Sequence, residues 1–195
     1  MNRFFESSYL SWEILPAANA DFIKETFSHL IYLEENERDT WKYADTVDYY
    51  FNQRPVGGER PTPLSGMLIT YEAFKNDLSR YGLVSTTPTE FVPDHSLDPY
   101  RILIRTAGCY SNDSYALFFD IQYGILQQLW FDYEDHISLE DDRQQMIDLL
   151  YALGNRYSLV LVDWYEKRII DLRDKDIILK YLQDVAAGFG FWEKE

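Results

Sequence analysis

The chain has 195 residues, of which 46% are hydrophobic and 17% aromatic, and its formal net charge at pH 7 is -15. This length fits a single domain of residues 1–195, with a possible subdivision into residues 1–82 and 100–195. The negative charge disfavours direct binding to nucleic acids and to anionic membranes, because both attract basic proteins. A basic protein partner is compatible with it, and the aromatic content argues against disorder.

The segment near the N-terminus does not resemble a secretory signal, because Glu6 and Glu13 interrupt its apolar residues. No run approaches the roughly 18 consecutive apolar residues of a transmembrane helix. Cys109 is the only cysteine, so the chain can form neither an internal disulfide nor a zinc site built on several cysteines. We therefore expect a cytoplasmic protein.

The first half of the chain is predicted to be helical. Asn19 can cap a helix whose apolar residues recur at helical spacing, and Asp39 can cap a second helix of the same kind. A loop rich in proline and glycine at residues 53–63 precedes a third helix over residues 64–78. Gly82 lies just past that helix, where a left-handed cap is needed.

The second half changes to the two-residue period of strands. Residues 100–107 and 115–123 are predicted strands, joined by a polar turn at residues 110–114. Gly124 marks a second turn, and residues 125–133 continue as a third strand. These three strands would form an antiparallel meander.

A helix, a hairpin and a last helix are predicted to follow. Ser138 and Asp141 form a partial capping box for a helix that Gly154 closes. Two short strands then make a second hairpin, and Asp174 caps the last helix. The predicted fold class is α+β, with a helical N-terminal half and an antiparallel sheet with flanking helices in the C-terminal half. We expect about five strands and one helix within residues 100–172.

Residues 106–142, between Arg105 and Arg143, contain no lysine or arginine, and we call them the base-free segment. They carry eight acids and many aromatics, a combination that suits a surface for a basic partner. We expect Trp130 or Tyr133 to supply an exposed aromatic anchor. The predicted partner-binding residues are Asp113, Asp120, Trp130, Asp132, Tyr133, Glu134, Asp135, Glu140, Asp141 and Asp142.

No motif predicts a catalytic residue, a cofactor or a metal site. Asp132, Glu134 and His136 could hold a divalent cation in a metal-dependent hydrolase, but a helix start attracts acids without any metal. His95 lies in a polar, proline-containing stretch typical of an exposed loop, and Cys109 is better explained as a small buried hydrophobe. A small-ligand sensor with an aromatic pocket is a third possibility.

The second half contains the runs RILIRT, YALFFDIQYG and YSLVLVDWYEKRIIDL, which begin at Arg101, Tyr115 and Tyr157. The chain resembles bacterial toxin-immunity proteins in these runs, in its acidity and in its lack of catalytic motifs. Such proteins are small, acidic, cytoplasmic α+β proteins. The resemblance implies a non-enzymatic protein whose acidic face neutralises a basic toxin domain, such as a nuclease. It identifies no individual site residues.

Overall fold

The computed structural model describes residues 12–36, 62–86, 108–133 and 140–189. The chain divides into two compact units, which we describe separately. The larger unit comprises Met1–Ala17 with Pro63–Glu195, and the smaller unit comprises Ala18–Thr62.

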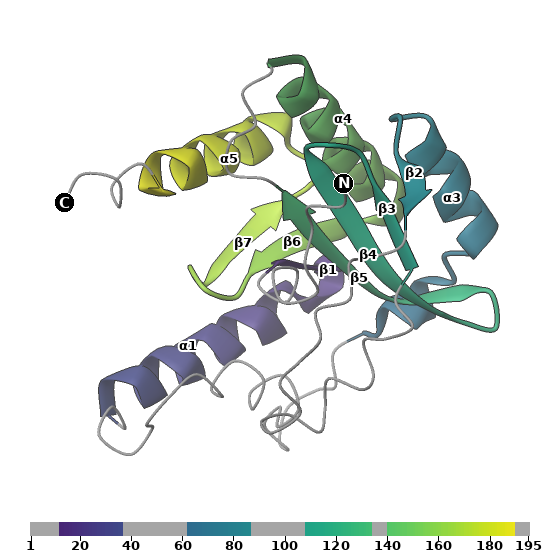
Figure 1. The fold of residues 1–195 in the computed structure, drawn as a ribbon. Coiled ribbons are helices and arrows are strands. Elements are labelled where there is room, and N and C mark those ends of the chain that lie inside the picture. Colours follow the sequence, from purple (N-terminus) through teal and green to yellow (C-terminus); the bar gives the residue numbers. More distant parts are fainter. Residues whose placement is uncertain (1–11, 37–61, 87–107, 134–139, 190–195) are drawn as a thin grey trace, which may run out of the picture. The chain divides into compact units, whose positions relative to one another are not determined.

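The larger unit is built on a seven-stranded antiparallel sheet (Figure 1). Its strand order is β2-β3-β4-β5-β1-β6-β7, so the first strand lies between two strands from the second half of the chain. The strands are β1 Trp12–Pro16, β2 Val84–Thr86, β3 Gly108–Ser111, β4 Tyr115–Gln122, β5 Ile125–Tyr133, β6 Leu159–Asp163 and β7 Arg168–Asp171.

Helices cover one face of this sheet. The helices of the larger unit are η3 Leu64–Met67, α3 Tyr71–Ser79, α4 Glu140–Tyr157 and α5 Lys175–Phe189, where η denotes a 3₁₀-helix. Phe74, Leu150 and Tyr181 on these helices share one buried core with Leu117 and Phe131 of the sheet. Within the described ranges, no helix combines the length and the apolar character that crossing a bilayer requires.

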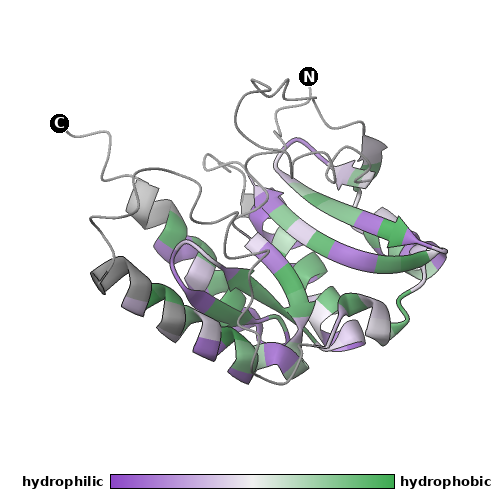
Figure 2. Ribbon diagram, turned by 90° about the horizontal axis from the view of Figure 1, so that it is seen from below, coloured by the Kyte–Doolittle hydropathy of each residue, from purple (hydrophilic) through white to green (hydrophobic). Residues whose placement is uncertain are grey.

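The opposite face of the sheet is also buried. Cys109, Phe118, Trp130 and Glu13 face one another in register across four neighbouring strands, so their side chains lie on the same face. The first three of them form a second apolar cluster together with Ala116. Figure 2 shows hydrophobic positions recurring along the strands and on the neighbouring helices. Strands buried on both faces need not show a simple alternation of apolar and polar residues.

The predicted helical first half is wrong, because its described residues include two strands. β1 is in the interior of the sheet and β2 is at its edge, while α1 (Ala20–Asn36) and α3 are the α-helices of this half. β1 has only five residues, with Glu13 among them, and its stability comes from pairing with β5 and β6 on both sides. Between residues 108 and 171 the described structure has five strands and α4, of which β4, β5, β6, β7 and α4 were predicted. β3 (Gly108–Ser111) was not, because Tyr110 and Ser111 were predicted to belong to a turn.

The predicted third helix is interrupted. η3 ends at Met67, and the residue that follows, Leu68, has a left-handed φ of 53°. α3 begins at Tyr71, and Thr70 caps it by accepting a hydrogen bond from the Ala73 amide at 3.3 Å. The apolar spacing continues through Leu68 although this side chain is largely exposed, which is why the periodicity was misleading. Gly82 has a φ of 71° after α3, in agreement with the predicted cap.

Local signals at three other helix ends had different outcomes. Asp174 caps α5 as predicted, because its Oδ1 accepts hydrogen bonds from the amides of Asp176 (2.9 Å) and Ile177 (3.3 Å). Gly154 does not close α4, which continues to Tyr157. The Asn19 side chain, in the 3₁₀-helix η2 (Ala17–Asn19), bonds to both backbone groups of Thr62 at 2.7 and 2.9 Å.

The remaining fold predictions lie outside the described residues. They are the helix capped by Asp39, the loop at residues 53–61, the strand at residues 100–107 and the capping box that begins at Ser138.

Candidate protein-interaction surface

The base-free segment folds into three adjacent strands, β3, β4 and β5, followed by the start of α4. Its two described turns lie at opposite ends of the eight-residue strand β4, which is about 26 Å long at 3.3 Å per residue. The accessible described acids of this segment therefore lie at two separate ends of β4.

At the first end, the β3–β4 turn lies against the start of α4. Asn112 organises the turn, because its Oδ1 accepts hydrogen bonds from the amides of Ser114 and Tyr115, both at 2.9 Å. Ser114 Oγ then donates to Asp142 Oδ2 at 2.5 Å. Asp113 is exposed and Asp142 is half-buried. We call Asp113 and Asp142 the acidic turn.

At the second end, residues 120–124 form what we call the hairpin tip. Tyr123 and Gly124 have φ values of 54° and 76°, which is typical of a two-residue type I′ turn. Asp120 is half-buried, and its Oδ1 accepts a hydrogen bond from the Ile121 amide at 2.8 Å beside a β-bulge. Tyr123 is 94% exposed, more than any other large hydrophobic residue in the described chain.

Three predicted site residues on β5 are buried. Trp130, Asp132 and Tyr133 have exposed fractions of 7%, 4% and 8%, respectively. The expectation that Trp130 or Tyr133 is an exposed anchor is therefore wrong. Both faces of β5 are buried from Leu129 to Tyr133, so consecutive side chains in this part of the strand all point into cores. Tyr133 contacts the Trp12 ring, with the ring centroids 5.1 Å apart.

The other predicted site residues are only partly described. Glu134 and Asp135 lie outside the described residues, as does His136 of the alternative metal site. Glu140 and Asp141 begin α4, but their side chains are not described. In the part of the chain that the structure describes, no group of three histidine, cysteine or acidic residues could hold a metal ion. The hydrolase alternative stays an untested prediction.

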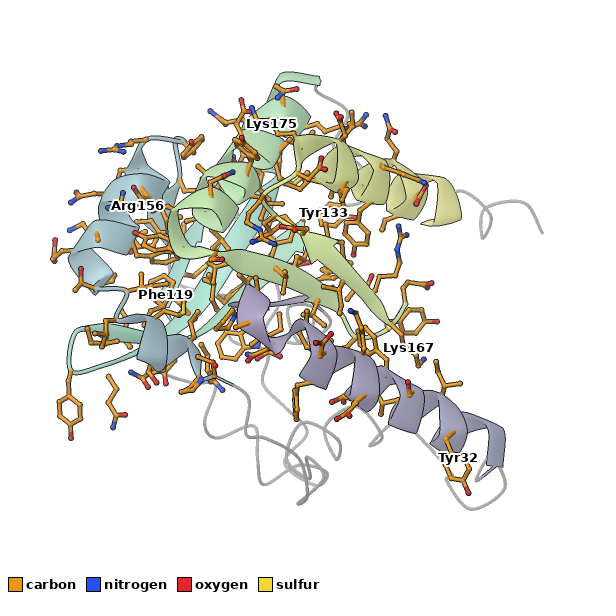
Figure 3. All side chains as sticks on the ribbon, turned by 180° about the vertical axis from the view of Figure 1, so that it is seen from behind. Tyr32, Phe119, Tyr133, Arg156, Lys167 and Lys175 are labelled. Atoms are coloured by element: carbon orange, nitrogen blue, oxygen red, sulfur yellow. The ribbon has the colours of Figure 1, made fainter. Side chains whose placement is uncertain are left out.

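A buried carboxylate that the sequence reasoning did not find connects α3 to the end of α4. Asp77 accepts hydrogen bonds from Arg156 Nη1 at 2.5 Å and from Tyr157 Oη at 2.7 Å, and Arg80 lies 3.6 Å away. Figure 3 shows Arg156 where these two helices meet. Burial raises the pKa of Tyr157 to about 12, and the bond to Asp77 adds to the shift. These contacts stabilise the fold and leave little of Asp77 accessible.

A second buried carboxylate connects the β6–β7 turn to α5. Asp163 accepts hydrogen bonds from Tyr181 Oη at 2.7 Å and from the Glu166 amide at 2.9 Å. Asp163 is the last residue of β6, and its side chain also holds the turn that follows. Burial raises the pKa of Tyr181, and the Asp163 charge adds to this shift.

Cys109 is buried, as predicted, with 3% of its surface exposed. Thr86 Oγ1 donates a hydrogen bond to its Sγ at 3.3 Å. Burial raises the pKa of the Cys109 thiol, which disfavours the reactive thiolate at neutral pH. These surroundings support a packing role for Cys109.

Comparison with known proteins adds no further information about the site. No protein-family model, curated protein or solved structure matches this chain. The two accessible ends of the base-free segment differ in chemistry. The acidic turn has two carboxylates, and the hairpin tip has one together with an exposed aromatic ring, a combination that suits contact with a cationic protein surface.

Proposed function

We propose that this chain is a non-enzymatic module that binds a basic protein, and that it acts as an immunity protein which neutralises a basic toxin domain. The observation that supports the proposal is the placement of the base-free segment. This segment, which has no lysine or arginine, has Asp113 of the β3–β4 turn and Asp142 of α4 at one end of β4 and Asp120 at the other.

The distribution of charge supports a cationic partner. Several basic side chains pair with acids outside the base-free segment, so those cations are already engaged elsewhere. These pairs are Lys24–Asp21, Arg156–Asp77, Arg168–Asp184, Arg173–Asp171 and Lys175–Asp148. The acids of the base-free segment add to a net charge of -15, and their mutual repulsion destabilises the free protein. Association with a cationic surface would replace that repulsion with attraction.

The test compares two variants with the same net charge. Asp113→Asn combined with Asp120→Asn removes one acid from each end of the base-free segment. Glu166→Gln combined with Asp176→Asn is the control, because it removes two exposed acids from the β6–β7 turn and from α5. The partner is first captured from cells of the source organism and identified by mass spectrometry.

We expect the captured partner to be basic. At low salt, the association rate constant of the Asp113/Asp120 variant should be at least about threefold lower than that of the wild type. This rate constant should also depend less on salt concentration. The control variant should behave like the wild type. If both variants associate equally fast, the base-free segment does not steer the partner.

The immunity role has a separate test in cells. Expression of the captured partner alone should stop growth, and co-expression of the wild-type chain should restore it. Survival without the chain would show that the partner is no toxin, even if the two proteins bind.

A further inference from the structure

The tyrosine at the hairpin tip is an unfavourable residue for its position. Tyr123 takes the first place of a two-residue turn and has a φ of 54°, where turns of this type prefer asparagine, aspartate or glycine. Left-handed backbone is unfavourable for a bulky residue, and 94% of the side chain is exposed to water. Folding therefore gains little from this ring.

A second strained apolar residue lies beside the same hairpin. Leu68 has a φ of 53° and is 71% exposed. The backbone that follows it pairs with the hairpin, because the Leu126 amide donates to Ile69 O and the Tyr71 amide donates to Gly124 O, both at 2.9 Å. Leu68 directly precedes Ile69, and Tyr123 directly precedes Gly124, so each adjoins one of these two hydrogen bonds. Figure 1 shows the β4–β5 hairpin beside the chain that leads into α3.

Strain and exposure together set these two residues apart. The described chain has four non-glycine residues with positive φ, and the other two, Ser158 and Lys167, are polar. Strained backbone is most often found at binding and catalytic sites, where function outweighs the loss of stability. An exposed tyrosine is also among the residue types that most often anchor protein interfaces.

We infer that Tyr123, assisted by Leu68, is the anchor by which the chain docks its basic partner. The inference rests on the proposed function and adds the position of the interface. The tyrosine ring would enter an apolar pocket of the partner, and Asp120 and Glu72 would face lysine or arginine side chains at the rim. Glu72 is exposed and follows Tyr71, whose amide donates to Gly124 O, so it lies close to the hairpin tip.

Charge selects this occupant over the alternatives. Asp120, Glu72 and the nearby Lys75 on α3 together give the tip a formal charge of -1. A second copy of the chain would bring its own net charge of -15 to the contact and be repelled. An anionic lipid surface would be repelled for the same reason. A basic protein would be attracted.

The first experiment places a photo-crosslinking phenylalanine analogue at position 123 or at position 165 of the full chain, in cells of the source organism. Tyr165 is the control because it is also exposed, at 77%, but lies in the β6–β7 turn. We expect position 123, and not position 165, to crosslink to the basic protein. Equal crosslinking from both positions would overturn the inference.

The second experiment uses Tyr123→Asn, which creates the preferred Asn-Gly turn, with Tyr165→Ser as the matched control. Tyr123→Asn should raise the melting temperature by about 2–4 °C, because it relieves backbone strain. The same variant should raise the Kd for the partner identified by crosslinking, purified separately, on the order of 30-fold, as the loss of an aromatic anchor does. Tyr165→Ser should leave this Kd unchanged.

Leu68→Asn provides an independent check, since it should also stabilise the fold and weaken binding. A lower melting temperature for Tyr123→Asn would show that the ring supports the fold, and would overturn the inference. An unchanged Kd, for a partner whose association still depends on salt, would overturn the anchor and leave the proposed function intact. Failure to find any basic partner would overturn both. Self-association of the wild type that Tyr123→Asn abolishes would identify a second copy as the occupant instead.

Discussion

The hydrogen bond between Tyr181 and Asp163 should contribute a stability that depends on pH. Tyr181 Oη donates to Asp163 Oδ2 at 2.7 Å, and the two residues are 1% and 2% exposed. A hydrogen bond to a charged acceptor contributes about 1.5–3 kcal/mol. Tyr181→Phe removes this bond and leaves Asp163 with the one from the Glu166 amide. We expect the free energy of unfolding to fall by about 2 kcal/mol at pH 8.

This loss should shrink at high pH. Burial, reinforced by Asp163, raises the pKa of Tyr181 above the value of 10.0 that it has in the unfolded chain. A raised folded-state pKa gives stability that is fully present below pH 10 and decreases as the pH rises. At pH 11 the unfolded chain gains about 1.4 kcal/mol by ionising this tyrosine, and the folded state does not. The effect of Tyr181→Phe should therefore fall to about 0.6 kcal/mol.

Urea unfolding followed by circular dichroism at pH 8 and pH 11 measures both values. Tyr115→Phe is the matched control, because burial also raises the pKa of Tyr115 but its hydroxyl donates to no carboxylate among the described residues. This variant should be neutral or slightly stabilising at pH 8, and more stable than the wild type by about 1.4 kcal/mol at pH 11. A constant effect of Tyr181→Phe between the two pH values would refute the argument, since it would mean that Tyr181 ionises equally in both states.

Three further predictions concern contacts elsewhere in the larger unit. Gly154→Ala should lower the free energy of unfolding by about 2 kcal/mol, because its Cβ would lie 2.3 Å from the Leu172 carbonyl oxygen, and an unchanged melting temperature would contradict this. Asp77→Asn should destabilise by about 1–2 kcal/mol, because it breaks the pair with the half-exposed Arg156, and high salt should reduce the difference from wild type in urea unfolding. Cys109 should react with iodoacetamide at pH 7 far more slowly in the folded protein than in urea, because burial raises its pKa; equal rates would refute this.

The sequence was most informative where structure depends on neighbouring residues. β4 and β5 were predicted from alternation and from the turn at Gly124, and the Asp174 cap depends on amides two and three residues away. β1 could not be predicted in this way. Glu13 pairs with Trp130 and Val162, which are more than 100 residues away, and five residues carry too little pattern to show it.

The candidate surface was predicted only in outline. The lack of basic residues in the base-free segment is visible in the sequence. Which of its acids are accessible depends on how the fold packs around β5, which lies between β4 and β1. Asp132 and Tyr133 are buried because β1 closes that side of the hairpin. Tyr123 had a local signal that the sequence reasoning did not use. A two-residue turn with glycine in second place also requires positive φ at the first place.

The position of β1 in the sheet has a consequence for how the chain folds during synthesis. β1 is made before its two partners, β5 and β6, which lie more than 100 residues further along the chain. Until then Trp12–Pro16 has unpaired backbone on both sides, and the hairpins β4–β5 and β6–β7 remain separate blocks. Contacts between residues so distant in sequence form slowly, because a large loop must close first. We therefore expect the sheet to be completed late in folding, and the partly folded chain to depend on chaperones until its first strand is inserted.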